Sequence, residues 1–344
     1  MILKNIFNKC LGEKRKEQLR RKFASFFILY DKKLYKKTYN RMLKYILKQK
    51  IDNANGYGYR KDSFLAQVKE EYVKYLILND EETRGDSRYK ECLEYIKKYG
   101  VRTFCHDGID YNIYNKQSVH YDDEKQLFWV YYRNKKLYMK RSINTEEAVL
   151  EVINMLAAEQ EEASPHRYIN ENFEILENDV VFDIGCAEGN FALSVIDAVK
   201  KIYMFEADEE WIEALNCTFE PYKEKIMIIP KYVSDRDTEE SITVDSFCRA
   251  NGIEKIDFVK MDVEGAEPDV LRGAREMIKK GSIAKIAACT YHNAEDETKI
   301  RELLKAYDCQ VTQGFMQVAE RNEIWDIKKP FFLPVLLQCR YIGK

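Results

Sequence analysis

Proline is missing from almost half of the chain. None of the six prolines in the 344 residues precedes Pro165. Proline interrupts helices and central strands, so its absence leaves the first part free to form uninterrupted helices. Its appearance at Pro165 indicates a change of architecture near that residue.

Long apolar runs and paired cysteines are also lacking. The apolar run at residues 26–30 is far too short to span a bilayer, and the first residues lack the pattern of a signal peptide. Nine cysteines occur without any C-x-x-C pair, which predicts reduced thiols and argues against a disulfide framework or a zinc site. We therefore expect a cytoplasmic protein.

Net charge is nearly absent overall, at -2, but it is unevenly distributed. Residues 1–60 hold 17 Lys and Arg against 4 Asp and Glu, so the remainder is acidic. Such asymmetry fits peripheral docking on a membrane surface or a partner protein, and a solvated basic helix face is the alternative. The basic stretch carries no recognised nucleic-acid-reading motif, so we expect no nucleic acid partner.

The first half divides into two predicted regions. Apolar residues recur at helical spacing within 35–46, 64–76 and 89–96, which predicts a mainly helical region over residues 1–110. Aromatic-rich segments then predict a β-hairpin around residues 127–139, followed by a helix over 145–161. Residues 111–168 are therefore interpreted as a hairpin and helix that lead into the next domain.

Strand and helix patterns alternate after residue 168. Short apolar runs predict buried strands at 180–182, 202–205, 226–229, 258–259 and 286–288. One helix is expected from Pro268 to Gly281, another through Ile300 and Tyr307, and two last strands within 310–319 and 331–341. This alternation predicts an α/β domain with a parallel sheet over residues 169–344.

A glycine-rich turn follows the first of these strands, with the sequence D-I-G-C-A-E-G-N at residues 183–190. Ligands of such sheets bind at the carboxyl ends of the strands. Gly185 and Gly189 remove side chains where a ligand would approach the backbone. The helix that begins near Asn190 offers free N–H groups to a carboxylate.

The spacing of acids and glycines indicates which ligand binds there. Glu206 lies 21 residues after Gly185, where an acid can accept hydrogen bonds from ribose hydroxyls. The two glycines are four residues apart with no third, unlike the G-x-G-x-x-G of dinucleotide sites. Asp183 would repel a phosphate but suits an ammonium, so we predict S-adenosylmethionine, bound by Asp183, Gly185, Gly189, Asn190, Glu206 and Asp262.

Several separated segments resemble the FkbM family of methyltransferases. They are the glycine turn, Phe205-Glu206, residues 241–245, the K-M-D-V-E-G-A-E segment at 260–267 and Tyr291-His292, within a resemblance that covers about residues 159–341. One departure is Ala207, where many members have proline. The resemblance implies a class I, Rossmann-like methyltransferase fold, a seven-stranded sheet with an antiparallel last strand, and O-methylation of a hydroxyl on a sugar or other small molecule.

Three candidate catalytic residues fall at predicted strand ends: Asp262, Glu264 and His292. Methyl transfer from a sulfonium mainly requires a positioned acceptor, and a hydroxyl acceptor must also lose its proton. The three side chains could supply a general base with its orienting partner, or hold a divalent cation that lowers the pKa of the acceptor. The alternatives are a helix-capping Glu264, an Asp262 that only contacts the cofactor, and a buried, hydrogen-bonded His292.

Two classes of function follow. The first is an S-adenosylmethionine-dependent O-methyltransferase that acts on a sugar, a glycan precursor or another small molecule, with an N-linked or lipid acceptor as the alternative. The second is an interaction protein, in which the basic N-terminal region docks on a membrane surface or partner protein. His166 lies just before the predicted sheet and is interpreted either as part of a lid or as part of a rigid linker.

Overall fold

A computed structural model describes residues 64–319 and 327–343. The predictions made for residues 1–63, including the basic region, lie outside the described residues. The chain divides into two compact units, of which the first contains residues 64–107 and 317–332 and the second contains 108–316 and 333–344. The expected division into 1–110, 111–168 and 169–344 differs from this partition, because 111–168 shares a unit with the large sheet and 317–332 joins the first unit.

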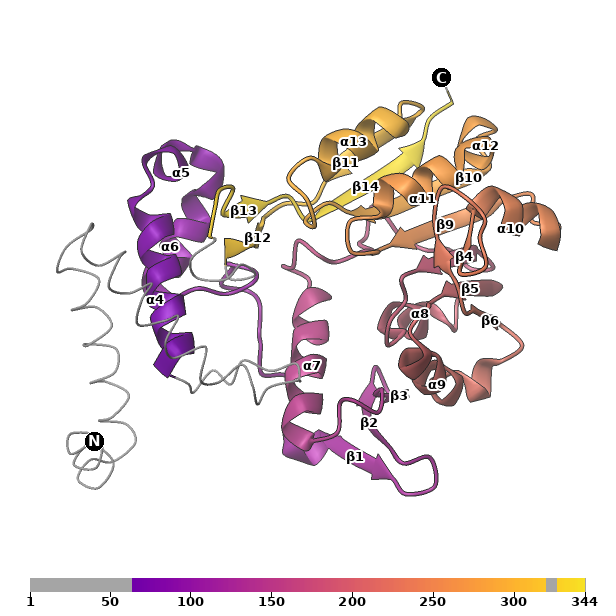
Figure 1. The fold of residues 1–344 in the computed structure, drawn as a ribbon, viewed down its shortest axis with the longest axis horizontal. Helices are drawn as coiled ribbons and strands as arrows, with labels where there is room; N and C mark the ends of the chain where they lie inside the picture. The colour runs from indigo at the N-terminus through magenta and orange to yellow at the C-terminus, as the bar shows by residue number, and fades with distance from the viewer. Residues whose placement is uncertain (1–63, 320–326, 344) are drawn as a thin grey trace. The chain divides into compact units, whose positions relative to one another are not determined.

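The described part of the first unit is helical. It contains α4 (Phe64–Asn79), α5 (Glu81–Gly85), η2 (Ser87–Tyr89) and α6 (Lys90–Tyr99) (Figure 1). The predicted apolar stripe of α6 is buried, and the helix ends at Gly100, whose φ of 90° suits a glycine. Lys329 pairs with Asp80 at 2.6 Å, which ties the returning segment to these helices.

A three-stranded antiparallel sheet begins the second unit. After η3 (Lys116–Ser118) it contains β1 (Val119–Asp122), β2 (Leu127–Tyr132) and β3 (Lys135–Tyr138), and α7 (Glu146–Glu159) follows. The predicted hairpin is confirmed as β2 and β3, joined by Arg133 and Asn134 at φ values of 48° and 63°, as a two-residue primed turn requires. β1 was not predicted.

The large sheet has seven strands in the order β11-β14-β10-β9-β4-β5-β6. β4 pairs in parallel with β5 and β9, and β14 is antiparallel to both β10 and β11. The expected seven-stranded sheet, with both parallel and antiparallel strands, is thus confirmed. The strands are β4 (Val180–Ile184), β5 (Lys201–Phe205), β6 (Ile226–Ile229), β9 (Ile256–Met261), β10 (Ile283–Cys289), β11 (Tyr307–Val311) and β14 (Leu336–Tyr341).

Helices and short strands connect these elements. The helices are α8 (Asn190–Val195), α9 (Glu209–Thr218), η4 (Glu220–Tyr222), α10 (Val244–Asn251), α11 (Glu267–Gly273), α12 (Arg275–Lys279) and α13 (Asp296–Leu303). Two small sheets pair β7 (Tyr232–Val233) with β8 (Ser241–Ile242), and β12 (Met316–Gln317) with β13 (Phe332–Leu333). The buried faces of the large sheet and its helices form the main core.

Two helix predictions were wrong in their extent. The helix expected from Pro268 to Gly281 is divided into α11 and α12, because the Asp245 carboxylate accepts hydrogen bonds from the N–H groups of Glu276 and Met277 and caps a new helix there. Tyr307, expected in the helix through Ile300, instead begins β11, and its hydroxyl donates to the Ile283 carbonyl at 2.8 Å.

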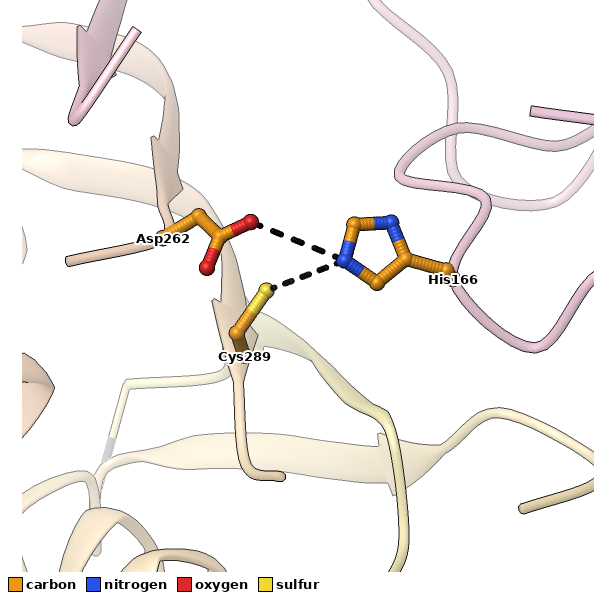
Figure 2. A group of neighbouring side chains, drawn as sticks. All are labelled: His166, Asp262 and Cys289. Atoms are coloured by element: carbon orange, nitrogen blue, oxygen red, sulfur yellow. Dashed lines mark hydrogen bonds and ion pairs between the residues drawn. The ribbon is translucent and has the colours of Figure 1, made fainter. Parts of the chain in front are cut away.

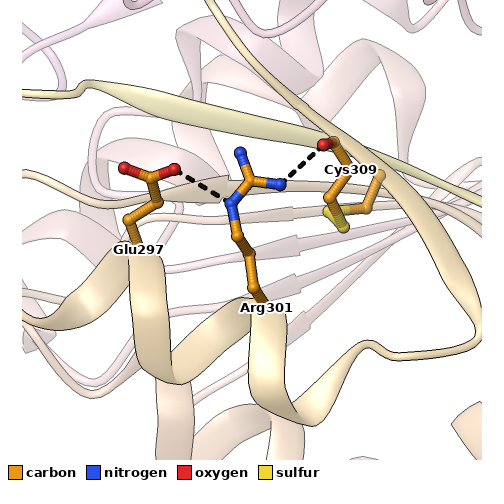
Figure 3. The surroundings of a disulfide bond; sticks show 4 residues. Glu297, Arg301 and Cys309 are labelled. Atoms are coloured by element: carbon orange, nitrogen blue, oxygen red, sulfur yellow. Dashed lines mark hydrogen bonds and ion pairs between the residues drawn. A yellow bond between two sulfur atoms is a disulfide. The ribbon is translucent and has the colours of Figure 1, made fainter.

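The prediction of reduced cysteines without disulfides was also wrong. Cys309 of β11 and Cys339 of β14 are directly opposite in the strand register, with Cα atoms 4.0 Å apart, and form a disulfide (Figure 3). Arg301 of α13 donates to the Cys309 carbonyl at 2.7 Å and to Glu297 at 2.9 Å. The disulfide therefore links β11 to β14, and Arg301 attaches α13 to β11.

None of the described helices combines the length and the apolar character that a bilayer-spanning helix needs.

Candidate functional site

The glycine turn after β4 is shaped by close packing. Gly185 has a φ of 69°, and a Cβ there would lie 2.0 Å from the Asp262 carbonyl oxygen. Gly189 has a φ of 80°, and a Cβ there would lie 2.7 Å from Leu215 of α9. Asn190 is buried as the first residue of α8. Both glycines are therefore required by protein packing, in addition to any ligand that approaches the turn.

A buried ion pair lies beneath this turn. The Asp183 carboxylate is fully buried and lies 3.2 Å from the Lys260 ammonium, which also donates to the Gly185 carbonyl at 2.6 Å. Burial alone would lower the pKa of Lys260, but the carboxylates of Asp183 and Asp262 outweigh it and raise this pKa. Lys260 is thus the charged partner of Asp183 in this structure, and the expected contact of Asp183 with a ligand ammonium stays a prediction.

Glu206, at the end of β5, joins two loops. Its carboxylate accepts hydrogen bonds from the N–H groups of Ala187 at 2.8 Å, Ala207 at 2.9 Å and Asp208 at 2.9 Å. A carboxylate has about four lone-pair positions, so capacity remains for a further donor. Proline at position 207 would lack the N–H group, so the departure from the family pattern adds a donor to Glu206.

Asp262 follows β9 and is surrounded by donors. The hydroxyls of Tyr168 and Tyr291 donate to it at 2.9 and 3.0 Å, and His166 Nε2 lies 3.6 Å from Oδ2. Burial alone would raise the pKa of Asp262, but His166, together with Lys260 and His292, lowers it well below its usual range. Asp262 is consequently an anion and a poor proton acceptor.

His166 is brought into the site by the segment that precedes the sheet. Figure 2 shows its imidazole facing Asp262 and Cys289, and Cys289 Sγ lies 3.8 Å from His166 Nε2. Burial raises the pKa of the Cys289 thiol well above its usual value, so the thiol is neutral. His166 thus contacts the site, and both its lid and its linker interpretation stay predictions. Tyr168 was missed, since nothing in its sequence neighbourhood indicates a contact with a residue 94 positions away.

His292, directly after β10, meets three acids. Its Nδ1 lies 3.0 Å from Glu267 Oε1, and its Nε2 lies 3.4 Å from Asp262 Oδ1 and 3.6 Å from Glu264 Oε2. The predicted trio of Asp262, Glu264 and His292 is thus brought together. Glu267 was missed as a site residue, although it is the last acid of the K-x-D-x-E-G-x-E segment.

The helix-capping alternative for Glu264 is not supported. Its side chain is 94% exposed, and the N-cap of α11 is Ala266, with no side-chain cap from the described residues. Glu264 has a φ of 53° and Gly265 a φ of 97°, so the chain folds back between Asp262 and Glu267. This turn lets both carboxylates approach the same imidazole.

Comparison with known families gives a match for the part of the chain that contains the turn from Asp262 to Glu267. Residues 227–311 match the family model of the methyltransferase FkbM domain. The matched segment includes Asp262, Glu267 and His292, and the glycine turn lies outside it. No curated protein matches the chain.

Solved structures with a similar arrangement include several methyltransferases. Methyltransferase FkbM from Methylobacillus flagellatus KT shares 16% identity over 65% of this chain, with a TM-score of 0.37, and this chain covers 56% of its length. A putative methyltransferase from Streptococcus mutans in complex with SAH shares 11% identity over 49% of this chain and 91% of its own, with a TM-score of 0.34. The tRNA m1G37 methyltransferase of M. jannaschii shares 16% identity over 63% of this chain and 55% of its own, with a TM-score of 0.34.

Proposed function

We propose that the chain, whose residues 227–311 match the family model of the methyltransferase FkbM domain, is an S-adenosylmethionine-dependent methyltransferase that transfers the methyl group to a hydroxyl of a sugar, a glycan precursor or another small molecule. The observation that carries the proposal is the proximity of the glycine turn to the catalytic candidates. The Asp262 N–H donates to the Ile184 carbonyl at 3.1 Å, directly before Gly185.

The cofactor is assigned to the turn and to the end of β5. Glu206 would accept hydrogen bonds from the ribose with its remaining capacity, and the backbone at Gly185, Gly189 and Asn190 would hold the aminoacyl part. Asp183 acts indirectly, since its partner Lys260 holds the Gly185 carbonyl. The Asp262 anion would lie near the positive sulfonium.

The acceptor is assigned to the side of Asp262 that carries Glu264 and His292. During transfer the acceptor oxygen forms a bond to the methyl carbon while the carbon–sulfur bond breaks and its electron pair stays on the sulfur. The protein's task is to align the two reactants and to remove the hydroxyl proton. Asp262 is a weak base, so His292 and Glu264 are the residues that act on the hydroxyl.

Calorimetry with S-adenosylmethionine and S-adenosylhomocysteine tests the cofactor assignment. We expect the wild type and the matched control Glu209→Gln, an exposed acid on α9, to bind both compounds. Glu206→Gln should bind at least tenfold more weakly, because a lost charge-assisted hydrogen bond is worth about 1.5–3 kcal/mol. A wild-type protein that binds neither compound would refute the proposal.

The acceptor class and the cellular location remain proposals. A screen of hydroxylated small molecules, with amine and lipid acceptors in parallel, tests the preference for a hydroxyl acceptor. Co-sedimentation of the full chain with anionic and with neutral vesicles tests membrane docking through the basic residues 1–60. Docking predicts binding to the anionic vesicles that weakens as salt is raised.

A further inference from the structure

We propose that Asp262, Glu267 and His292 form a binding site for a divalent cation of the Mn²⁺ or Mg²⁺ class, which would hold the acceptor hydroxyl. This inference rests on the proposed methyl transfer and names the agent that activates the acceptor. It also decides between the two roles that the sequence left open for these residues, a general base with its partner or a cation site.

Buried polar atoms that make no hydrogen bond of acceptable geometry are the first observation. Glu267 is fully buried; its Oε1 accepts a hydrogen bond from the Val263 N–H at 2.9 Å, whereas its Oε2 has no hydrogen-bond partner among the described residues. The side chain of His292 is 6% exposed, and neither ring nitrogen makes a hydrogen bond of acceptable geometry within the described chain. Such atoms are rare in folded proteins, and an ion is one of the few explanations for a cluster of them.

The spacing of the candidate ligand atoms is the second observation. One atom each from Asp262, Glu267 and His292 lies within 4.8 Å of the other two. His292 Nε2 and Asp262 Oδ1 are 3.4 Å apart. Two nitrogen or oxygen ligands that each lie about 2.1 Å from one ion are separated by roughly 3.0–3.5 Å, so this pair has the spacing of ligands that share an ion.

Charge supports the same assignment. The carboxyl groups of Asp262 and Glu267 face one imidazole, and the exposed Glu264 adds a third at 3.6 Å from Nε2. The positive groups nearby lie on the other side of Asp262, where Lys260 is paired with Asp183 and His166 faces Oδ2. A divalent cation would balance the acids that surround His292, and carboxylates with one imidazole suit Mn²⁺ well.

The backbone brings these ligands together at a conformational cost. Glu264 lies in the left-handed region, which non-glycine residues adopt rarely and which is concentrated at functional sites. A Cβ on Gly265 would lie 2.7 Å from the Asn293 side chain. The turn is therefore fitted tightly against the residue after His292.

The neighbouring group of His166, Asp262 and Cys289 does not carry the same inference. Tyr291 Oη lies 3.1 Å from His166 Nε2 and donates to Asp262, and Tyr168 donates to the other oxygen of Asp262. Hydrogen bonds therefore occupy the atoms through which His166 and Asp262 face each other, namely His166 Nε2 and the two Asp262 oxygens. The cation is assigned to the His292 side of Asp262.

The bound cation would lower the pKa of a coordinated acceptor hydroxyl. The proton of the acceptor hydroxyl would pass to the exposed Glu264 carboxylate as the oxygen–carbon bond forms and the carbon–sulfur bond breaks. The electron pair of the broken bond leaves with S-adenosylhomocysteine. No oxidation or reduction is involved.

A titration of the chelator-treated full chain with Mn²⁺ tests the site. Binding is measured as the loss of the free Mn²⁺ signal in electron paramagnetic resonance. The variants are Glu267→Gln and His292→Asn, and the matched control is Asp269→Asn, a carboxylate of the same helix that is 42% exposed and pairs with Arg272 at 2.6 Å. We expect one Mn²⁺ per chain for the wild type and the control, and at least tenfold weaker binding for the two variants. Binding of S-adenosylhomocysteine, measured on the same samples, verifies that each variant is folded.

Three outcomes overturn the inference. If the wild type binds S-adenosylhomocysteine but no Mn²⁺, or if folded Glu267→Gln binds Mn²⁺ as tightly as the wild type, the cation site is wrong and the proposed methyl transfer stands. If the wild type binds neither Mn²⁺ nor S-adenosylhomocysteine, both proposals are refuted.

Discussion

Replacing Lys260 by methionine should remove the support of the cofactor turn. The side chains of Lys260 and Asp183 are 6% and 0% exposed, and Lys260 also holds the Gly185 carbonyl. Methionine keeps most of the volume but leaves Asp183 as a buried carboxylate without its cation. The variant should therefore lose stability and cofactor binding together.

The size of this effect follows from the burial of the pair. Removing one partner of a buried ion pair typically costs about 3–5 kcal/mol. For a unit of this size, each 1 kcal/mol lowers the melting temperature by about 2–4 °C. A decrease of roughly 6–20 °C is therefore expected.

The loss should depend on pH in a defined direction. Burial already raises the pKa of Asp183 while Lys260 lowers it, so removing Lys260 raises that pKa further. A group whose folded pKa exceeds its unfolded value destabilises the fold progressively as pH rises through that interval. Lys260→Met should therefore be more destabilised at about pH 8 than at about pH 5, and adding Asp183→Asn should remove the difference.

Thermal unfolding followed by circular dichroism, with Lys255→Met as the control, measures both effects. Lys255 precedes β9 and its side chain is 67% exposed, so its replacement should leave the transition unchanged. If Lys260→Met has the same melting temperature as the control at both pH values, the Lys260–Asp183 pair does not support the turn.

Three further predictions concern the same unit. Gly185→Ala should abolish S-adenosylhomocysteine binding in calorimetry, because its Cβ would lie 2.0 Å from the Asp262 carbonyl oxygen at a φ of 69°; binding within twofold of wild type would contradict this. Burial raises the pKa of Glu188 from 4.5 to about 8, so the free energy of unfolding should fall as pH rises between those values. In denaturant titrations Glu188→Gln should remove this pH dependence and, above about pH 8, be more stable than the wild type by a few kcal/mol. His292→Ala should lower turnover at least a hundredfold with little change in S-adenosylmethionine affinity, and an unchanged turnover would exclude His292 from the chemistry.

Much of the fold could be predicted because most residues of the apolar strands in the large sheet are buried. The apolar runs of β4, β5, β6, β9 and β10 stand out in the sequence for this reason. Tyr307 was placed wrongly because its spacing from Ile300 also fits a helix, and only the position of the Ile283 carbonyl decides for a strand. The disulfide between Cys309 and Cys339 depends on strand register, which the spacing of two cysteines does not reveal.

The site was predictable at the level of motifs and not of contacts. Asp262, Glu264 and His292 were predicted to meet because strand ends share an edge of the sheet, and they do. Lys260 and Glu267 act through partners in other segments, Asp183 and His292. Their presence in the K-x-D-x-E-G-x-E segment therefore did not reveal what they contact.

The contacts of Tyr168 with Asp262 have a consequence for where the catalytic unit begins. A protein fragment that begins at β4 would retain every strand of the large sheet and the whole glycine turn. It would nevertheless expose Asp262 to water on the side that His166 and Tyr168 cover. The shortest fragment expected to keep a preorganised anion beside the methyl donor therefore starts before His166, well upstream of residues 227–311, which match the family model.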